Sequence, residues 1–318
     1  MRTAAIVPTY QNAGTLPRVL ADLEAQGFAV IVVDDGSRDG TAEFLRAWQP
    51  GGAGRHVETL PTNGGKGRAL ERGLARARTL GFTRVVTVDA DGQHLAADAR
   101  RVADAHADGL TVGARAEQVD GYPARSLFGR RLWAMGVRAL TGLGVPDPIC
   151  GLRAYPLDGP AAAIRCRTGR FAWEEEWLVR AAWAEIPVRW ESITTIYLPP
   201  GQRVSHWAWH DWVRNIGAWL LLAAERLLPW TGPWQPDALQ PLAAPDRSSR
   251  WLAWTGFMIA AAIGAAGGAF GPNGLMATVT IVVLLAVRWH VKPWFAARAA
   301  LVGWMVVAAA ILLQRNAG

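Results

Sequence analysis

The chain contains little cysteine and little lysine. Its two cysteines, Cys150 and Cys166, fit no metal-binding motif by their spacing, and two cysteines cannot build a disulfide framework. We therefore expect reduced cysteines in a cytosolic domain. Lys66 and Lys292 are the only lysines among 33 basic residues, so the formal net charge of +7 depends on arginine.

The sequence also lacks a compact basic run and a signal peptide. Its cations are scattered through both halves, which argues against nucleic acid as a partner and suits anionic lipid head groups. The first residues lead directly into a strand-like run without the apolar core of a cleavable signal. We expect the first domain to begin folding in the cytosol.

Up to about residue 200, short apolar runs alternate with segments that suit helices. Runs rich in β-branched residues, without polar alternation, predict strands at residues 4–7, 30–33, 57–60 and 85–88. Helices are predicted between them at residues 16–26, 41–48 and 66–80. This alternation is typical of an α/β fold with a doubly wound parallel sheet, in which ligands bind beyond the carboxyl ends of the strands.

Three of these strand ends carry polar residues, in the segments Pro8-Thr9-Tyr10, Asp34-Asp35 and Asp89-Ala90-Asp91. In an extended backbone Asp89, Asp91 and Gln93 would point the same way and offer hard oxygen ligands to Mg²⁺ or Mn²⁺. The alternative is a pair of carboxylates that are merely solvated at a turn. A carboxylate of the Asp34-Asp35 loop could hold the base or ribose of a nucleotide, or the loop could simply lead into an N-capped helix.

Lys66 follows the glycines of Asn63-Gly64-Gly65 at a predicted helix start. No Ser or Thr follows the lysine, so the segment is not a P-loop. A lysine retained in an arginine-rich chain suggests a compact cation close to phosphate. An ordinary residue at a helix start is the alternative.

Beyond residue 206 the chain becomes more apolar. Residues 207–234 are rich in tryptophan, yet they carry charges and prolines, which predicts helices that lie at a membrane interface and continue into a polar linker up to residue 250. Residues 251–318 predict transmembrane helices at about 251–270, 274–290 and 296–313. A buried helical hairpin in a soluble domain is the alternative.

The charges around these apolar runs predict an orientation. Arg247 and Arg250 precede the first run, whereas Arg288, Lys292 and Arg298 flank the second turn. Since cytoplasmic loops carry an excess of Lys and Arg, both regions are expected in the cytoplasm. The prediction is a multi-pass protein of the cytoplasmic (inner) membrane with its catalytic domain, residues 1–206, in the cytoplasm.

Taken together, the motifs resemble those of family 2 glycosyltransferases in order and spacing. The resemblance is closest to the bacterial branch that is similar to polyprenyl-phosphate (dolichyl-phosphate) mannose synthases, and it covers roughly residues 4–206. It rests on Ile6-Val7-Pro8-Thr9-Tyr10, on residues 32–41, on Asn63-Gly64-Gly65-Lys66-Gly67 and on Asp89-Ala90-Asp91-Gly92-Gln93-His94, and continues to Ser205-His206.

The resemblance implies a GT-A fold, a GDP- or UDP-sugar donor and a divalent metal. It places Pro8, Tyr10, Asp35 and Asp89 in the nucleotide pocket, near Lys66, with Asp89, Asp91 and Gln93 as metal ligands. Asp91, Glu174 and Glu176 are the expected catalytic residues, although a solvated helix start is the alternative for the two glutamates. The residues expected to hold the acceptor or a phosphate are Arg115, Arg153, Arg203 and His206, of which His206 could instead pack at the interface.

The predicted activity is an inverting sugar transfer from a nucleotide sugar to a lipid. Polyprenyl phosphate is the first choice of acceptor, and a hydroxyl of a polyene pigment or another acyl lipid is the second, because residues 197–206 resemble a bacterial subgroup that occurs with such lipids. A nucleotidyltransferase is disfavoured because no Gly-rich signature follows the first strand. A non-catalytic membrane scaffold is disfavoured by the intact Asp89, Asp91 and Gln93. The sugar, the base and homo-oligomerisation are left open.

Overall fold

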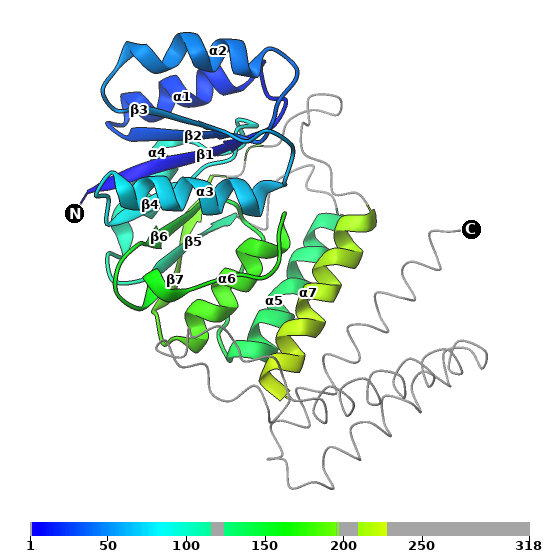
Figure 1. Cartoon of the computed structure of the whole chain (residues 1–318). Helices are drawn as coiled ribbons and strands as arrows, with labels where there is room; N and C mark the ends of the chain where they lie inside the picture. The colour runs from blue at the N-terminus through cyan, green and yellow to red at the C-terminus, as the bar shows by residue number, and fades with distance from the viewer. Residues whose placement is uncertain (1, 116–123, 195, 197–208, 228–318) are drawn as a thin grey trace, which may run out of the picture. The chain divides into compact units, whose positions relative to one another are not determined.

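The computed structural model describes residues 2–115, 124–194, 196 and 209–227 (Figure 1). Residues up to Leu222 form one compact unit, and a second unit begins at Ala223. The expected transmembrane segments 251–270, 274–290 and 296–313 lie outside the described residues, as do Arg203 and His206. Among the described helices, none combines the length and the hydropathy needed to cross a membrane.

Helices and strands alternate along the described chain. The first half consists of β1 (Thr3–Thr9), α1 (Leu16–Ala25), β2 (Ala29–Asp34), α2 (Thr41–Trp48), β3 (Arg55–Thr59), α3 (Lys66–Thr79) and β4 (Arg84–Thr87). The second half consists of α4 (Ala96–Ala105), β5 (Leu110–Arg115), α5 (Ala124–Thr141), β6 (Arg153–Pro156), α6 (Ala172–Trp183), β7 (Val188–Ile193) and α7 (Trp209–Leu227). Short 3₁₀ turns lie at Gln49–Gly51 and Gly159–Ala163.

The strands form one seven-stranded sheet in the order β3-β2-β1-β4-β6-β5-β7. The four strands expected from the sequence are present and run parallel, with Ala4 opposite Ala29 and Val85. β6 lies between β4 and β5 and runs antiparallel to both, so the sheet is mixed rather than parallel throughout. β6 has only four residues, and their hydrophobic pattern does not predict whether the strand runs parallel or antiparallel to its neighbours.

The sheet core is built from the β-branched runs that predicted it. In β1 and β2 the central residues, such as Ile6 and Val32, are fully buried. α3 crosses β1 and β2 at very short range, because a Cβ at Gly73 would lie 2.6 Å from Ile6 Cγ2. This close approach brings the first residue of α3, Lys66, to the carboxyl ends of the strands.

α7 is the one described helix of the tryptophan-rich segment, and it lies beside α5 (Figure 1). Trp219 of α7 stacks on Trp133 of α5 with ring centroids 5.7 Å apart. Trp219 Nε1–H also donates to the buried Glu175 carboxyl of α6 at 2.7 Å, and Asn215 Nδ2–H donates to it at 3.3 Å. Burial raises the pKa of Glu175 to about 8. An acidic side chain therefore joins α6 to α7.

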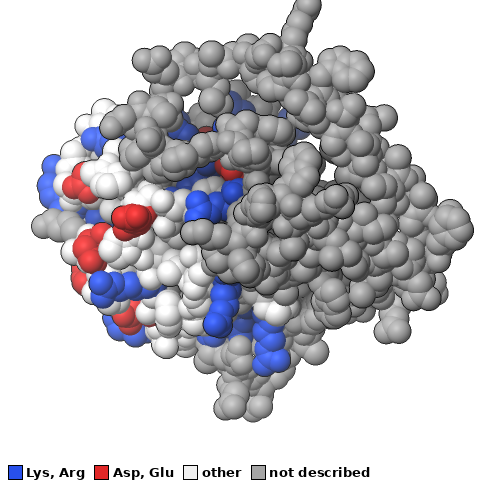
Figure 2. Space-filling view, turned by 90° about the horizontal axis from the view of Figure 1, so that it is seen from below, with Lys and Arg blue, Asp and Glu red and all other residues white. Residues whose placement is uncertain are grey.

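On the face of the molecule shown in Figure 2, basic and acidic side chains of the described residues are interspersed with uncharged ones. Elsewhere, exposed charges form pairs on one helix, such as Arg18 with Asp22 at 3.7 Å and Arg46 with Glu43 at 2.8 Å. Exposed pairs of this kind contribute little to stability, since water screens them.

Gly73→Ala is expected to destabilise the fold although alanine is the better helix former by about 1 kcal/mol. The added methyl group would overlap Ile6 Cγ2, and overpacking of this kind costs about 1–3 kcal/mol. Urea denaturation of the full-length protein in detergent measures the change. The same substitution made in an Ile6→Ala background is the control, because the space is then open and the cost should shrink. Equal costs in both backgrounds would contradict the close approach.

Glu175→Gln is expected to flatten the pH dependence of stability. The raised pKa means that the folded chain keeps a proton that the unfolded chain releases above about pH 4.5. Wild-type stability therefore falls as the pH rises from there toward 8, by up to about 1.4 kcal/mol per pH unit. The glutamine variant cannot ionise, so denaturation at pH 5, 6, 7 and 8 should show a smaller decline. Glu43→Gln, on the exposed surface of α2, is the control, and a decline equal to the wild type in Glu175→Gln would refute the assignment.

Candidate functional site

A pocket lies at the carboxyl ends of β1, β2 and β4. Its lining comes from five parts of the chain: the end of β1 and the loop after it, Asp35 after β2, the start of α3, the turn after β4, and the residues before α6. The lining residues used below are Pro8, Tyr10, Asn12, Asp35, Lys66, Asp89, Asp91, Arg170 and Phe171. The pocket thus gathers the strand-end residues that the sequence singled out.

The acidic loop after β2 ties the neighbouring loops together. Both oxygens of Asp35 accept backbone N–H groups, from Gly64 at 2.8 Å and from Gly65 at 2.7 Å. On the other side Ser37 Oγ accepts the N–H of Gln11 at 2.9 Å. Asp39 accepts the N–H of Ala13 at 3.1 Å and the hydroxyl of Thr41 at 2.6 Å. Asp35 therefore shapes the pocket by fixing the loop that leads into α3.

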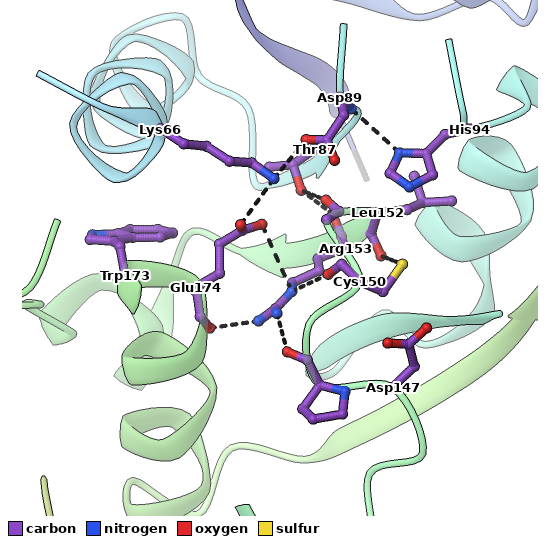
Figure 3. Close-up of polar contacts among 12 residues, drawn as sticks. Lys66, Thr87, Asp89, His94, Asp147, Cys150, Leu152, Arg153, Trp173 and Glu174 are labelled. Carbon is purple, nitrogen blue, oxygen red and sulfur yellow. Dashed lines mark hydrogen bonds and ion pairs between the residues drawn. The ribbon is translucent and has the colours of Figure 1, made fainter. Parts of the chain in front are cut away.

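Lys66 lies between two carboxylates, those of Asp89 and Glu174 (Figure 3). Its ammonium nitrogen is 2.6 Å from Asp89 Oδ1 and 2.9 Å from Glu174 Oε2. Burial alone would lower the pKa of Lys66, but the charges of Asp89 and Glu174 outweigh it and raise the pKa. The lysine thus joins the start of α3, the end of β4 and the first turn of α6 through one cation.

Gly151 leaves the space in which this ion pair sits. A Cβ at that position would lie 2.6 Å from Lys66 Nζ and would collide with the Asp89 carboxylate. Its carbonyl accepts the hydroxyl of Thr87 at 2.8 Å, which holds the segment against the end of β4. The Lys66–Asp89 ion pair therefore requires a glycine at position 151.

Asp89 and Asp91 lie on the turn after β4. The backbone N–H of Gln93 donates to Asp91 Oδ1 at 3.0 Å, and the N–H of Asp89 donates to His94 Nδ1 at 3.4 Å. Burial and the nearby Asp89 charge raise the pKa of Asp91 to about 6. Burial lowers the pKa of His94 to about 4, so its ring is neutral at pH 7.

The donor set of this turn suits a hard divalent cation. Among the described residues no three His, Cys, Asp and Glu side chains form a ready-made metal cluster. Asp89 and Asp91 nevertheless line one pocket, and within the described chain the second oxygen of Asp91 accepts no hydrogen bond. The Asp89 charge disfavours ionisation of Asp91, and an added cation would stabilise the ionised form of Asp91.

Three consecutive glutamates at the start of α6 point in three directions. Glu174 contacts Lys66, and Glu175 faces α7. The Glu176 carboxylate accepts the N–H groups of Arg167 and Thr168 at 3.0 and 2.8 Å, and the Nε–H of Arg180 at 2.6 Å. Burial tends to raise the pKa of Glu176, but these hydrogen bonds and the Arg180 charge lower it. Glu176 therefore holds the segment before α6 in place, and Glu174 is the one that contacts the pocket-lining Lys66.

The arginines expected to hold phosphate make structural contacts. Arg115 forms a two-pronged pair with the buried Asp147, at 2.7 and 3.0 Å. Arg153 is buried and donates to the backbone carbonyls of Cys150, Pro148 and Glu174 (Figure 3). Neither is among the residues that line the pocket.

Sequence reasoning missed several residues of the site. Arg170 and Phe171 line the pocket from the segment before α6, and Asn12 lines it from the loop after β1. Arg170 has a left-handed backbone with φ 54°. The signal that could have pointed to this segment is the unbroken acidic triplet beside Trp173 and Trp177, which marks a buried helix start. The same signal could have pointed to Glu175, which lies in the middle of the triplet.

Comparison with known proteins identifies the family of the chain. The model of glycosyl transferase family 2 matches residues 4–156. The undecaprenyl-phosphate mannosyltransferase of Micrococcus luteus is 30% identical over 167 residues, which cover 50% of this chain and 68% of that protein. The undecaprenyl-phosphate 4-deoxy-4-formamido-L-arabinose transferase of Pseudomonas aeruginosa is 32% identical over 173 residues, which cover 52% of this chain and 50% of that protein. The chain thus spans about half the length of the latter relative.

Solved structures share the fold. Mannosyl-3-phosphoglycerate synthase from Rubrobacter xylanophilus matches with a TM-score of 0.53 at 18% identity, covering 77% of this chain and 78% of that one. Glucosyl-3-phosphoglycerate synthase from Mycobacterium tuberculosis, solved with Mn²⁺, UDP and phosphoglyceric acid, matches with a TM-score of 0.51 at 16% identity, covering 70% and 78% of the two chains. Together with the sequence matches, these likenesses show that the described domain has the GT-A fold and that the chain belongs to glycosyl transferase family 2.

Proposed function

We propose that the chain is a membrane-associated, inverting glycosyltransferase that moves a sugar from a nucleotide-sugar donor to polyprenyl phosphate. Relatives that are 30–32% identical are named as transferases that act on undecaprenyl phosphate. The observation that carries the proposal is the pocket at the carboxyl ends of β1, β2 and β4, into which Lys66, Asp89 and Asp91 converge. Ligands of open α/β sheets bind at such strand ends.

On the donor side, Asp89 and Asp91 are the residues that would hold a divalent cation. The M. tuberculosis structure of the same fold was solved with Mn²⁺ and UDP, which supports a divalent cation and a nucleotide-sugar donor for this chain. When bound, such a cation neutralises the diphosphate that leaves as the sugar bond breaks. Gln93, predicted as a third ligand, lies on the same turn and already orients Asp91 through its backbone N–H.

On the acceptor side, the environment of Glu174 favours a phosphate over a hydroxyl. A hydroxyl acceptor needs a base to take its proton, whereas a phosphate oxygen arrives already ionised. Glu174 is paired with Lys66 and is not among the described residues that line the pocket. A carboxylate engaged in this way is poorly placed to accept a proton from an acceptor. Polyprenyl phosphate therefore fits this site better than the hydroxyl of a polyene or acyl lipid.

The proposed location is the cytoplasmic membrane. Its support is the apolar sequence of residues 251–313 and the membrane-lipid substrates in the names of the relatives. The tryptophan-rich segment that contains α7 would bring the lipid head group to the level of the pocket. Residues 1–206 would work on the cytoplasmic side.

The test is transfer by the full-length protein in detergent from a panel of radiolabelled UDP- and GDP-sugars to undecaprenyl phosphate, with Mn²⁺ or Mg²⁺. We expect the label to appear in the lipid fraction. Mild acid should then release it, because a sugar joined to a lipid through phosphate is acid-labile. Label that resists mild acid and appears in another lipid would favour a hydroxyl acceptor. No transfer and no nucleotide binding with any donor would favour a non-catalytic scaffold.

Asp91→Asn is expected to lower transfer about 100-fold or more, because it removes a charge aimed at the metal and the leaving diphosphate. The measurement is the initial rate as a function of Mn²⁺ concentration, in which the variant should need more metal or fail to respond. Asp22→Asn, at the exposed surface of α1, is the matched control and should behave as wild type. Full activity of Asp91→Asn at an unchanged Mn²⁺ requirement would refute the role of Asp91.

A further inference from the structure

The pocket is lined by two cations, Lys66 and Arg170. They differ in what they contact. Lys66 is neutralised by Asp89 and Glu174. Arg170 is only partly buried, and within the described chain its guanidinium has no hydrogen-bond or ion-pair partner. Arg170 is thus the pocket-lining cation that can give its charge to a ligand.

The backbone of Arg170 is held in place from two sides. Glu176 anchors the residues just before it, accepting N–H groups from Arg167 and Thr168. On the α3 side, Gly65 has no side chain, and a Cβ there would collide with Arg170 Cγ. The left-handed φ of 54° is uncommon for a residue other than glycine and costs free energy. Glycine would adopt this backbone without strain, so the presence of arginine favours a role for its side chain.

Two backbone groups before α3 that could bind phosphate are already engaged. The N–H groups of Gly64 and Gly65 point to Asp35, so the entrance to α3 does not offer them to an anion. Asp35, Asp89 and Asp91 all line the pocket and would repel a diphosphate. A guanidinium matches the geometry of phosphate oxygens with two parallel N–H groups, which a single ammonium does not.

We propose that Arg170 binds the diphosphate of the nucleotide-sugar donor. The inference rests on the proposed function and adds a donor-binding residue that the sequence motifs did not indicate. The two arginines of the described chain expected in this role, Arg115 and Arg153, contact Asp147 and backbone carbonyls instead. Arg170 is a binding residue, and its loss acts on donor affinity.

The test measures binding of UDP and GDP with Mn²⁺ to the full-length protein in detergent by titration calorimetry. Arg170→Gln should weaken binding of the preferred diphosphate about tenfold, since one charge-assisted contact is lost. Binding of the matching nucleoside, followed by saturation-transfer NMR, should stay unchanged. Arg170→Lys should recover only part of the loss. Arg68→Gln is the matched control, because Arg68 is an exposed arginine near the same loop that does not line the pocket.

Arg170→Gly separates binding from folding. Glycine adopts the left-handed backbone readily, so the melting temperature should equal or exceed that of the wild type while diphosphate binding is as weak as in Arg170→Gln. Wild-type diphosphate affinity in both variants would overturn the inference and leave the proposed function standing. A rise only in the KM for undecaprenyl phosphate would assign Arg170 to the acceptor phosphate and also overturn it. If the wild-type protein binds neither diphosphate with Mn²⁺, the proposed function fails as well.

Discussion

The site depends on one buried cation, the ammonium of Lys66 between Asp89 and Glu174. These three residues come from α3, the end of β4 and α6, so the ion pairs fix three elements at the floor of the pocket. Removing one partner from a buried pair costs about 3–5 kcal/mol, because the other charge is left uncompensated. The close packing of α3 on β1 at Gly73 and the absence of a side chain at Gly151 are both conditions for this arrangement.

Around Lys66, some residues hold the pocket in shape and others have atoms available to bind a ligand. Asp35 and Glu176 use their carboxylates to hold backbone N–H groups on either side. Asp91 and Arg170 retain unpaired atoms within the described chain. A negative and a positive group are thereby left available in one cavity, which suits a substrate that arrives as an anion with a metal ion.

The sequence predicted the local parts of this structure well. The β-branched runs gave β1 to β4, and the strand-end motifs gave the residues that line the pocket. Contacts between distant segments could not be predicted. Consecutive helical residues diverge by about 100°, so Glu174, Glu175 and Glu176 must face different neighbours, but only the fold shows that α7 and residues 167–168 are those neighbours. The pairing of Arg115 with Asp147, the antiparallel β6 and the left-handed Arg170 likewise follow from tertiary structure.

The burial of the Lys66 pair sets it apart from the ion pairs on the surface of the molecule. The Lys66 side chain is only 13% exposed, whereas Arg46 and Glu43 are 73% and 66% exposed. Dissolved ions screen exposed charges and have little access to buried ones. The floor of the pocket therefore keeps its geometry over a wide range of ionic strength, while the attraction of an incoming anion to its mouth weakens as salt is added.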